Sequence, residues 1–466
     1  MEEFLKSLKT KNIHIVGVTG SEGSSILDFL LKNDITNITV HDFVDSSNIN
    51  SSFITWHKGV VVKVRAKYLQ TFTSSIEKVT CRWKENYLVG IEDADIVFVP
   101  QSWRLYSQNK PLLKIQKKDI PFYSLTRLYL DFANATVIGI TGTVGKGSVA
   151  FGLVQFLEAA GRKVYFGGND TWRMQVLSDL SSMTKEDFLV LEISHRQLQE
   201  GFTRAPTIAV LTNIFPNHQD EVSFENYKRL KYSLFAKQTT HDTAIIYYDN
   251  DDAREMAQNL KLKVLYYSSK NKSMNTKNIQ SIYEYIMSIK SDQYTENLLA
   301  VGTIADVLGF ESQFIKKHLP NILGLPARMQ LIEEVNGVKF FDDIKSTTPW
   351  ATLAALEKLG PNSFLICGGR TKGIDYKDFL LDLKHKAKSV IMLKSELSQV
   401  AGQILDTTSV TIVESLSEAV SRAYKRAKRG DTILLSPAAA FFYTDFVKGK
   451  ESFRKLVTSL LQVVKE

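Results

Sequence analysis

Short apolar runs alternate with longer segments of helical periodicity along most of this chain, and the alternation restricts its fold more than any other pattern. The runs begin with Ile13–Val16 and recur to Thr432–Leu435. Strands of one direction need long crossover connections, usually helices, so this order predicts parallel α/β sheets. No run approaches the roughly 18 uninterrupted apolar residues of a membrane span, and the first residues form no signal-peptide core.

The length divides this α/β pattern into blocks. One hydrophobic core rarely organises 466 residues, so about three domains are expected. New strand series begin after Phe132 and near Gly324, which places the domains at 1–132, 133–323 and 324–466. We predict a Rossmann-like first domain, a central P-loop ATPase-type domain and a Rossmann-like third domain.

The first block has the order of a nucleotide-binding half. The strand Ile13–Val16 leads into a turn with three glycines, a helix is predicted over Ser25–Lys32, and the strand Ile38–Val40 is followed by Asp42. Strand, glycine turn, helix, strand and terminal acid are typical of Rossmann folds. Ser21 in the turn and Asp42 are candidate substrate-binding residues.

The strongest local motif is the glycine-rich stretch that follows the strand Thr136–Thr141. It runs Gly142-Thr143-Val144-Gly145-Lys146-Gly147-Ser148 and leads into a helix predicted over Val149–Ala160. Such a turn exposes backbone N–H groups and a helix N-terminus to phosphate oxygens, with the lysine offsetting phosphate charge and the serine available to Mg²⁺. The spacing departs from the general phosphate loop, and an ordinary tight turn is the alternative, but we favour phosphate binding.

Charge and cysteine content exclude several other classes. The net charge is only +8, and the basic clusters lack the interleaved aromatics of a nucleic-acid platform. The two cysteines, Cys81 and Cys367, have no metal-type spacing and suggest no disulfide framework. We expect a monomeric cytoplasmic protein with no nucleic-acid and no membrane partner.

A series of segments after the glycine loop resembles the Mur ligases, the ATP-dependent amide ligases of peptidoglycan precursor synthesis, and most of all the D-glutamate-adding (MurD) type. No segment is distinctive alone, but their shared order spans nearly the whole chain. The segments are Leu191-Glu192-Ile193-Ser194, Leu211-Thr212-Asn213-Ile214, Leu325-Pro326-Ala327-Arg328, Asp342 to Thr347, Gly368 to Gly373 and Leu434 to Ala438.

The resemblance implies a reaction and a set of site residues. An amino acid, D-glutamate by preference, would be joined to UDP-N-acetylmuramoyl-L-alanine through an acyl phosphate, with release of ADP and phosphate, in the synthesis of the cell wall that supports cell shape and division. Anionic groups converge in such a site, so Mg²⁺ and cationic side chains must offset their repulsion.

The implied catalytic residues are Lys146, Glu192, His218 and Lys231. The implied Mg²⁺ ligands are Ser148, Glu192, His218 and Lys231, the last as a carbamylated lysine. ATP would contact the loop from Gly142 to Ser148 together with Asn297, Arg328 and Asp343. The substrates would contact Ser21, Asp42, Asn169, Lys345, Thr347 and Lys372.

Taken without the resemblance, three of these residues have ordinary interpretations. Glu192 would be a strand-edge acid, His218 a hydrogen-bonded loop histidine and Lys231 a solvent-facing helix lysine. The family resemblance favours the functional role for each of them.

Departures from the family pattern gather at the substrate ends and leave two alternatives open. The chain has Gln101 and Ser102 after Pro100, His195 and Arg196 after Ser194, and Phe441-Phe442-Tyr443 where the family has a serine and an acid. Gly147-Ser148 also resembles folylpolyglutamate synthetases, although those enzymes lack a long block before the loop. The second alternative is a non-catalytic nucleotide-binding protein with this fold.

Overall fold

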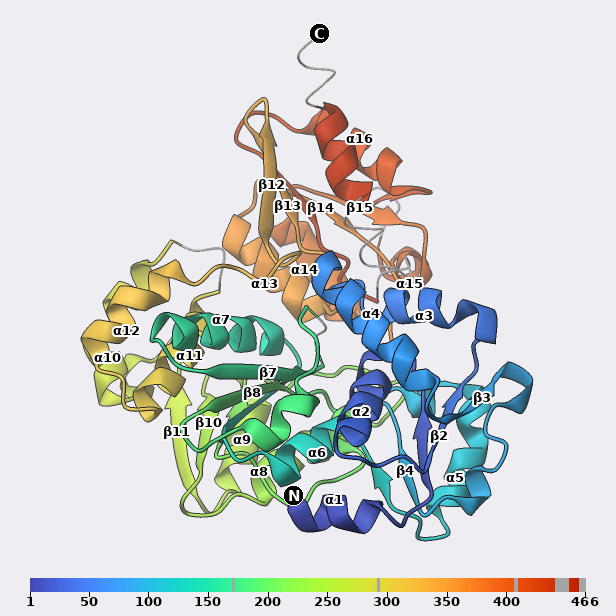
Figure 1. The fold of residues 1–466 in the computed structure, drawn as a ribbon. Coiled ribbons are helices and arrows are strands. Elements are labelled where there is room, and N and C mark those ends of the chain that lie inside the picture. The colour runs from blue at the N-terminus through green and yellow to red at the C-terminus, as the bar shows by residue number, and fades with distance from the viewer. Residues whose placement is uncertain (170–171, 291–293, 406–409, 441–451, 461–466) are drawn as a thin grey trace.

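The computed structural model describes residues 1–466 except 170–171, 291–293, 406–409, 441–451 and 461–466. The segment Phe441-Phe442-Tyr443 therefore lies outside the described residues. Three sheets follow one another along the chain, one within each predicted block, and the C-terminal sheet rises above the other two in Figure 1. The predicted block boundaries themselves stay predictions. In the described part of the chain, no helix is both long and apolar enough to cross a bilayer.

The first sheet has the Rossmann strand order β3-β2-β1-β4-β5, and all its pairings are parallel. Its strands are β1 (Ile13–Val16), β2 (Ile38–Asp42), β3 (Thr80–Trp83), β4 (Ile96–Phe98) and β5 (Phe122–Tyr123). Its helices are α1 (Glu2–Leu8), α2 (Ser21–Lys32), α3 (Ile49–Trp56), α4 (Val62–Ile76), α5 (Lys110–Gln116) and α6 (Leu125–Phe132).

The second sheet is also parallel, with the order β11-β10-β9-β6-β8-β7. Its strands are β6 (Thr136–Thr141), β7 (Val164–Gly168), β8 (Phe188–Glu192), β9 (Ile208–Leu211), β10 (Thr243–Tyr247) and β11 (Lys263–Tyr267). Its helices are α7 (Lys146–Ala159), α8 (Phe224–Ala236), α9 (Asp251–Gln258), α10 (Lys277–Ser288), α11 (Thr295–Val307) and α12 (Ser312–His318).

The third sheet has the order β12-β13-β17-β14-β15-β16, and its edge strand β12 is antiparallel to β13. Its strands are β12 (Gln330–Val335), β13 (Val338–Asp342), β14 (Ser363–Cys367), β15 (Ser389–Leu393), β16 (Thr411–Val413) and β17 (Thr432–Leu435). Its helices are α13 (Pro349–Leu359), α14 (Lys377–Lys386), α15 (Glu396–Ile404) and α16 (Leu416–Arg426).

Two predicted helix starts are wrong. The helix predicted from Ser25 begins at Ser21, and the helix predicted from Val149 begins at Lys146. In both cases the first turn consists of glycine, serine and charged residues, which carry no apolar periodicity. Lys146, Gly147 and Ser148 therefore belong to the first turn of α7.

One hydrophobic cluster spans the first two blocks, in addition to a separate cluster within each of them. Leu128 and Tyr129 of α6 are fully buried in a cluster that extends from Leu8 to Ala257. The Tyr129 hydroxyl accepts a hydrogen bond from the backbone N–H of Val176 at 2.8 Å. The N-terminal and central sheets are thus held together by packing, whereas the third sheet has its own clusters.

Candidate active site

The glycine loop between β6 and α7 has a backbone that only glycine can supply at two positions. Gly142 has φ 147° and Gly145 has φ 90°. A Cβ on Gly142 would lie 2.0 Å from Oγ1 of Thr212, and one on Gly145 would lie 2.9 Å from Oδ1 of Asn297. The glycines let the loop approach both neighbours closely, and Gly145 caps the N-terminus of α7.

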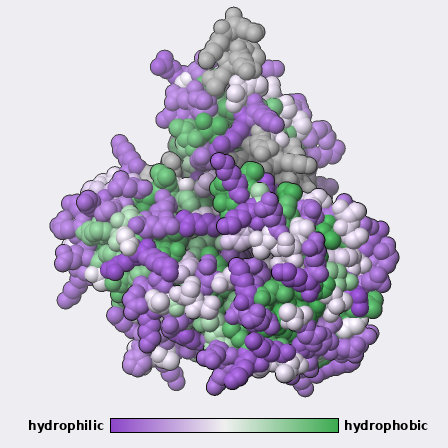
Figure 2. All heavy atoms as spheres, viewed as in Figure 1, coloured by the Kyte–Doolittle hydropathy of each residue, from purple (hydrophilic) through white to green (hydrophobic). Residues whose placement is uncertain are grey.

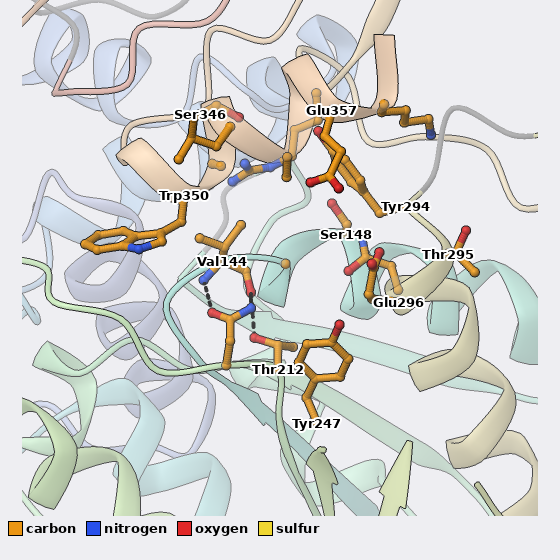
Figure 3. Close-up of a pocket in the computed structure, with 18 of the residues that line it drawn as sticks. Val144, Ser148, Thr212, Tyr247, Tyr294, Thr295, Glu296, Ser346, Trp350 and Glu357 are labelled. Carbon is orange, nitrogen blue, oxygen red and sulfur yellow. Dashed lines mark hydrogen bonds between the residues drawn. The ribbon is translucent and has the colours of Figure 1, made fainter. Parts of the chain in front are cut away.

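Side chains that follow β9 hold the tip of this loop (Figure 3). Asn213 accepts from the backbone N–H of Val144 through Oδ1 at 2.8 Å and donates to the Val144 carbonyl through Nδ2 at 3.0 Å. The Thr212 hydroxyl donates to the same carbonyl at 2.6 Å. The loop is therefore preformed at the N-terminus of α7, and Nζ of Lys146 donates back to the carbonyl of Thr143 at 3.2 Å.

A cavity of about 760 Å³ opens beside the loop, between the central and C-terminal blocks. Figure 3 shows Ser148 and Glu296 on one side of it and Trp350 and Glu357, from α13, on the other. The cavity brings together six residues predicted to contact ATP, namely Val144, Gly145, Ser148, Asn297, Arg328 and Asp343.

Asp343 is fixed within this wall. It is 1% exposed and accepts hydrogen bonds from the backbone N–H of Met329 at 3.1 Å and from the Ser436 hydroxyl at 2.8 Å. Burial raises the pKa of its carboxyl to about 6.

Lys231 projects from α8 into the base of the glycine loop. Its side chain is 1% exposed, and Nζ donates to the carbonyl oxygen of Gly142 at 2.7 Å. Burial and then the neighbouring Lys146 ammonium hold the pKa of Lys231 well below its usual range, against the opposing effect of Glu192. The ordinary interpretation, a solvent-facing helix lysine, is wrong.

Glu192 is the last residue of β8 and lies in register with Ile140 of β6, directly before the glycine loop begins. It is 5% exposed, and its Oε1 accepts from Nδ2 of Asn169 at 3.0 Å. Asn169, a predicted substrate-binding residue, therefore lies beside the predicted metal ligand Glu192.

His218 lies in a different cluster, next to two residues that the sequence marked only as departures. Its Nδ1 is 3.0 Å from Oε1 of Glu221 and 3.3 Å from Nη2 of Arg196, and its ring is 4.7 Å from that of His195. Burial lowers the pKa of His218 to about 4 and that of His195 to about 3, so both rings are neutral near pH 7. Lys231 and Tyr227 also adjoin His195, which places the cluster next to the loop.

The C-terminal block contributes a buried lysine. Nζ of Lys372 donates to the carbonyl of Thr347 at 2.9 Å and contacts its hydroxyl at 3.1 Å. Burial, with Arg196 and Arg370 nearby, lowers the pKa of Lys372 to about 8. The carbonyl of Lys372 accepts from the backbone N–H of Asp220 at 3.3 Å, so the turn that contains Lys372 adjoins the histidine cluster.

Lys345 lies next to the cavity wall, because its carbonyl accepts from Nη1 of the cavity residue Arg328 at 3.3 Å. Lys345, Thr347 and Lys372 are thus linked to the cavity wall or to the central block. The sequence indicates that these three residues lie together only through the order of the C-terminal motifs, because the spacing between the residues does not show that they are close in space.

The two N-terminal candidates lie in the first turn of α2 and at the end of β2. Asp42 is 3% exposed, and its Oδ2 accepts from the backbone N–H of Thr19 at 3.0 Å and from its hydroxyl at 2.8 Å. Ser21 is the first residue of α2. Asp42 therefore braces the glycine turn from within.

A buried hydrogen-bond network joins the N-terminal and central blocks, and the sequence did not predict it. Glu22 accepts from the backbone N–H of Gln101 at 2.6 Å and from Nε2 of Gln197 at 3.2 Å, and the Ser194 hydroxyl donates to Gln101 at 2.7 Å. Burial raises the pKa of Glu22 to about 7. The only sequence signal was that Gln101 departs from the family pattern.

Comparison with known proteins gives two family matches. A profile described as Mur ligase middle domain matches residues 140–305, and one described as Mur ligase, glutamate ligase domain, matches residues 327–439. The two matches cover the glycine loop, the cavity and the Thr347–Lys372 pair.

Curated relatives span most of the chain. A protein of Thermoanaerobacter sp. (strain X514), named UDP-N-acetylmuramoylalanine–D-glutamate ligase, is 31% identical over 370 residues, which cover 74% of this chain and 80% of the relative. A protein of the same name from Acetivibrio thermocellus is 27% identical over an alignment of 486 positions, which covers 99% of each protein.

Solved structures share the fold. The UDP-N-acetylmuramate–alanine ligase MurC of Thermotoga maritima superposes with a TM-score of 0.56 at 14% identity, over 96% of this chain and 99% of that chain. The MurF ligase of the same organism, in complex with ADP, superposes with a TM-score of 0.55 at 16% identity, over 84% and 92%. Together with the relative that is 31% identical, these matches establish that the chain belongs to the Mur ligase family.

Proposed function

We propose that this protein is an ATP-dependent ligase that joins D-glutamate to UDP-N-acetylmuramoyl-L-alanine and releases ADP and phosphate, as a step of peptidoglycan synthesis. The relatives that carry this activity in their names support the substrates. The observation that carries the proposal is the preformed glycine loop, which opens into a cavity walled by Asn297 on one side and Asp343 on the other.

The nucleotide would bind with its phosphates at the first turn of α7. Backbone N–H groups and the Lys146 ammonium would offset the triphosphate charge there. Asn297, Arg328 and Asp343 would contact the rest of ATP, with the tyrosines of the cavity, Tyr247 and Tyr294, beside it.

The chemistry of the donors near the loop suits Mg²⁺. Glu192 supplies a buried carboxylate beside the start of the loop, and Ser148 supplies a buried hydroxyl in the first turn of α7. Both are hard oxygen donors of the kind that Mg²⁺ accepts with water. When bound, the ion would neutralise the β- and γ-phosphate oxygens during transfer.

Lys231 would reach this site in a modified form. Its burial favours a neutral amine, which can add to CO₂ through a new N–C bond with loss of one proton, giving a carbamate anion. That anion would replace a disfavoured buried cation by a ligand for Mg²⁺. His218 is the fourth predicted ligand, and its neutral ring and position next to His195 are compatible with that role.

The acceptor amino acid would be held by the C-terminal block. The substrate carboxylate takes the γ-phosphoryl group and becomes an acyl phosphate, the amine of the amino acid attacks its carbonyl carbon, and phosphate leaves. Lys372 and Thr347 would bind a carboxylate of the incoming amino acid, and the lysine would orient the amine.

The test is phosphate release by the purified protein with ATP, Mg²⁺ and UDP-N-acetylmuramoyl-L-alanine. We expect release only when D-glutamate is added, and a panel of other amino acids and of folate serves as the control. Turnover with folate and no nucleotide sugar would replace this proposal. ATP binding without turnover on any member of the panel would favour a non-catalytic protein.

A further inference from the structure

The hairpin formed by α3 and α4 has an unusual charge. Between Asp45 and Glu77 there is no acidic residue, whereas the cations Lys58, Lys63, Arg65 and Lys67 lie around its turn. Lys63 and Lys67 are exposed. This surface is positive, although the whole chain carries a net charge of only +8.

The same hairpin exposes large apolar side chains. Trp56 is 47% exposed, Val61 67% and Val62 68%, and Ile54, Val64 and Tyr68 beside them are exposed as well. Figure 1 shows α3 and α4 on the side of the N-terminal sheet that is turned toward the C-terminal block, and Figure 2 shows apolar surface next to hydrophilic side chains over this part of the molecule. We call the residues from Trp56 to Tyr68 the hairpin tip.

The hairpin tip is held in place by its own interior. Phe53 and Phe72 are buried and stack with their ring centroids 4.7 Å apart, and Val60, in the turn between the helices, is buried as well. The inward face of the hairpin is therefore already packed. Trp56, Val61 and Val62 are exposed even though other apolar side chains fill the interior of the hairpin. A cluster of exposed apolar side chains of this kind marks an interaction surface.

We propose that the hairpin tip docks the protein on an anionic lipid bilayer. Tryptophan and short apolar side chains enter the boundary between headgroups and acyl chains, and surrounding lysines bind lipid phosphates. Each such cation strengthens binding to an anionic surface about fivefold. Docking of this kind needs no membrane-spanning helix, and the proposal replaces the expectation from sequence that the protein has no membrane partner.

Charge complementarity favours lipid over a second copy of the chain. A symmetric contact would bring the cations of two identical hairpin tips together, and the segment has no acidic residue to pair with them. An anionic bilayer offers the opposite charge together with an apolar layer of the required depth.

The test is co-sedimentation of the full chain with vesicles of phosphatidylcholine alone or mixed with phosphatidylglycerol. We expect binding only to the anionic vesicles, and weakening as salt is raised. The double variant Lys63→Glu with Lys67→Glu should weaken binding at least about tenfold. Lys117→Glu with Lys118→Glu, the same charge change at exposed sites of the same block, should leave binding unchanged.

The apolar contribution has its own matched pair. Val61→Asp with Val62→Asp should abolish binding, whereas Val89→Asp, at an exposed valine elsewhere in the block, should not. Brominated lipids should quench the fluorescence of the wild-type protein, and Trp56→Phe should remove that quenching. The hairpin-tip variants should keep the ligase activity and the melting temperature of the wild-type protein. Their loss of lipid binding would then not result from inactivation or unfolding.

Three results would overturn the proposal. The first is equal binding of the two double-lysine variants to anionic vesicles. The second is failure of brominated anionic vesicles to quench Trp56. The third is self-association of the protein, or binding of an oligonucleotide, that Lys63→Glu with Lys67→Glu abolishes while lipid binding stays unchanged. None of these outcomes bears on the proposed ligase reaction, since the hairpin tip contains no residue of the candidate active site.

Discussion

At the scale of single residues, the most informative side chain is Lys231, because its sequence context and its position disagree. Basic neighbours in Tyr227 to Tyr232 are typical of a solvated helix, yet this lysine is buried against the glycine loop. A buried ammonium beside Lys146 is costly, so the position suits a neutral or modified amine.

We predict that Lys231→Ala lowers kcat by at least about a hundredfold, because the variant cannot form the proposed carbamate ligand to Mg²⁺. Added formate or acetate should restore part of the activity by occupying the vacated space. Lys228→Ala, on the same helix but salt-bridged to Glu225 at the surface, is the control and should remain active. Full activity of Lys231→Ala would remove this residue from the mechanism.

A second residue-scale prediction concerns pH. Lys372 has a pKa near 8, so its cation is present below pH 8 and is lost as the pH rises through that value. If it binds a carboxylate of the amino acid, kcat/KM for that substrate should fall above pH 8. Lys372→Arg keeps its charge, so the alkaline fall should move to higher pH, and an unshifted profile would contradict the role.

At the scale of elements, the glycine loop should tolerate no side chain at Gly142. We predict that Gly142→Ala destabilises the protein by about 2 kcal/mol or more, because its Cβ would lie 2.0 Å from the Thr212 hydroxyl. ATP affinity should fall with it. Gly402→Ala, where the added Cβ meets nothing within 4 Å, should be neutral or stabilising in urea denaturation. Equal effects of the two variants would refute this view of the loop.

The elements also show what the sequence could and could not predict. The largely buried strands β1, β6 and β17 were predicted with their observed bounds, because each is a short and mostly apolar run. Strands β3 and β16 were missed, since half-exposed edge strands carry mixed side chains. Helix starts were predicted three or four residues late, where glycine and serine lead into α2 and α7.

The same distinction applies to the site. Residues on the motif segments, such as Ser148 and Asn297, could be predicted because they resemble a family pattern, and they line one cavity. The contacts of His195, Arg196 and Glu221 could not, because they depend on a loop conformation, with His218 at φ 55°, that no local pattern encodes.

At the scale of the whole molecule, the hydrophobic clusters do not follow the division of the chain into three sheets. One apolar cluster joins the N-terminal and central sheets through α6, and separate clusters fill the C-terminal block. We predict that amides of β1 and β6 share one opening free energy in native-state hydrogen exchange, while those of β14 have another. Opening of β1 well before β6 would contradict the shared core.

The central claim is that this cavity activates a carboxylate as an acyl phosphate, and oxygen transfer tests it most directly. The substrate UDP-N-acetylmuramoyl-L-alanine would be prepared with ¹⁸O in its alanine carboxylate and turned over with ATP and D-glutamate. The account predicts one ¹⁸O atom per inorganic phosphate released, because the bridging oxygen of the acyl phosphate leaves with phosphorus. Release of unlabelled phosphate, or label found in AMP, would contradict it.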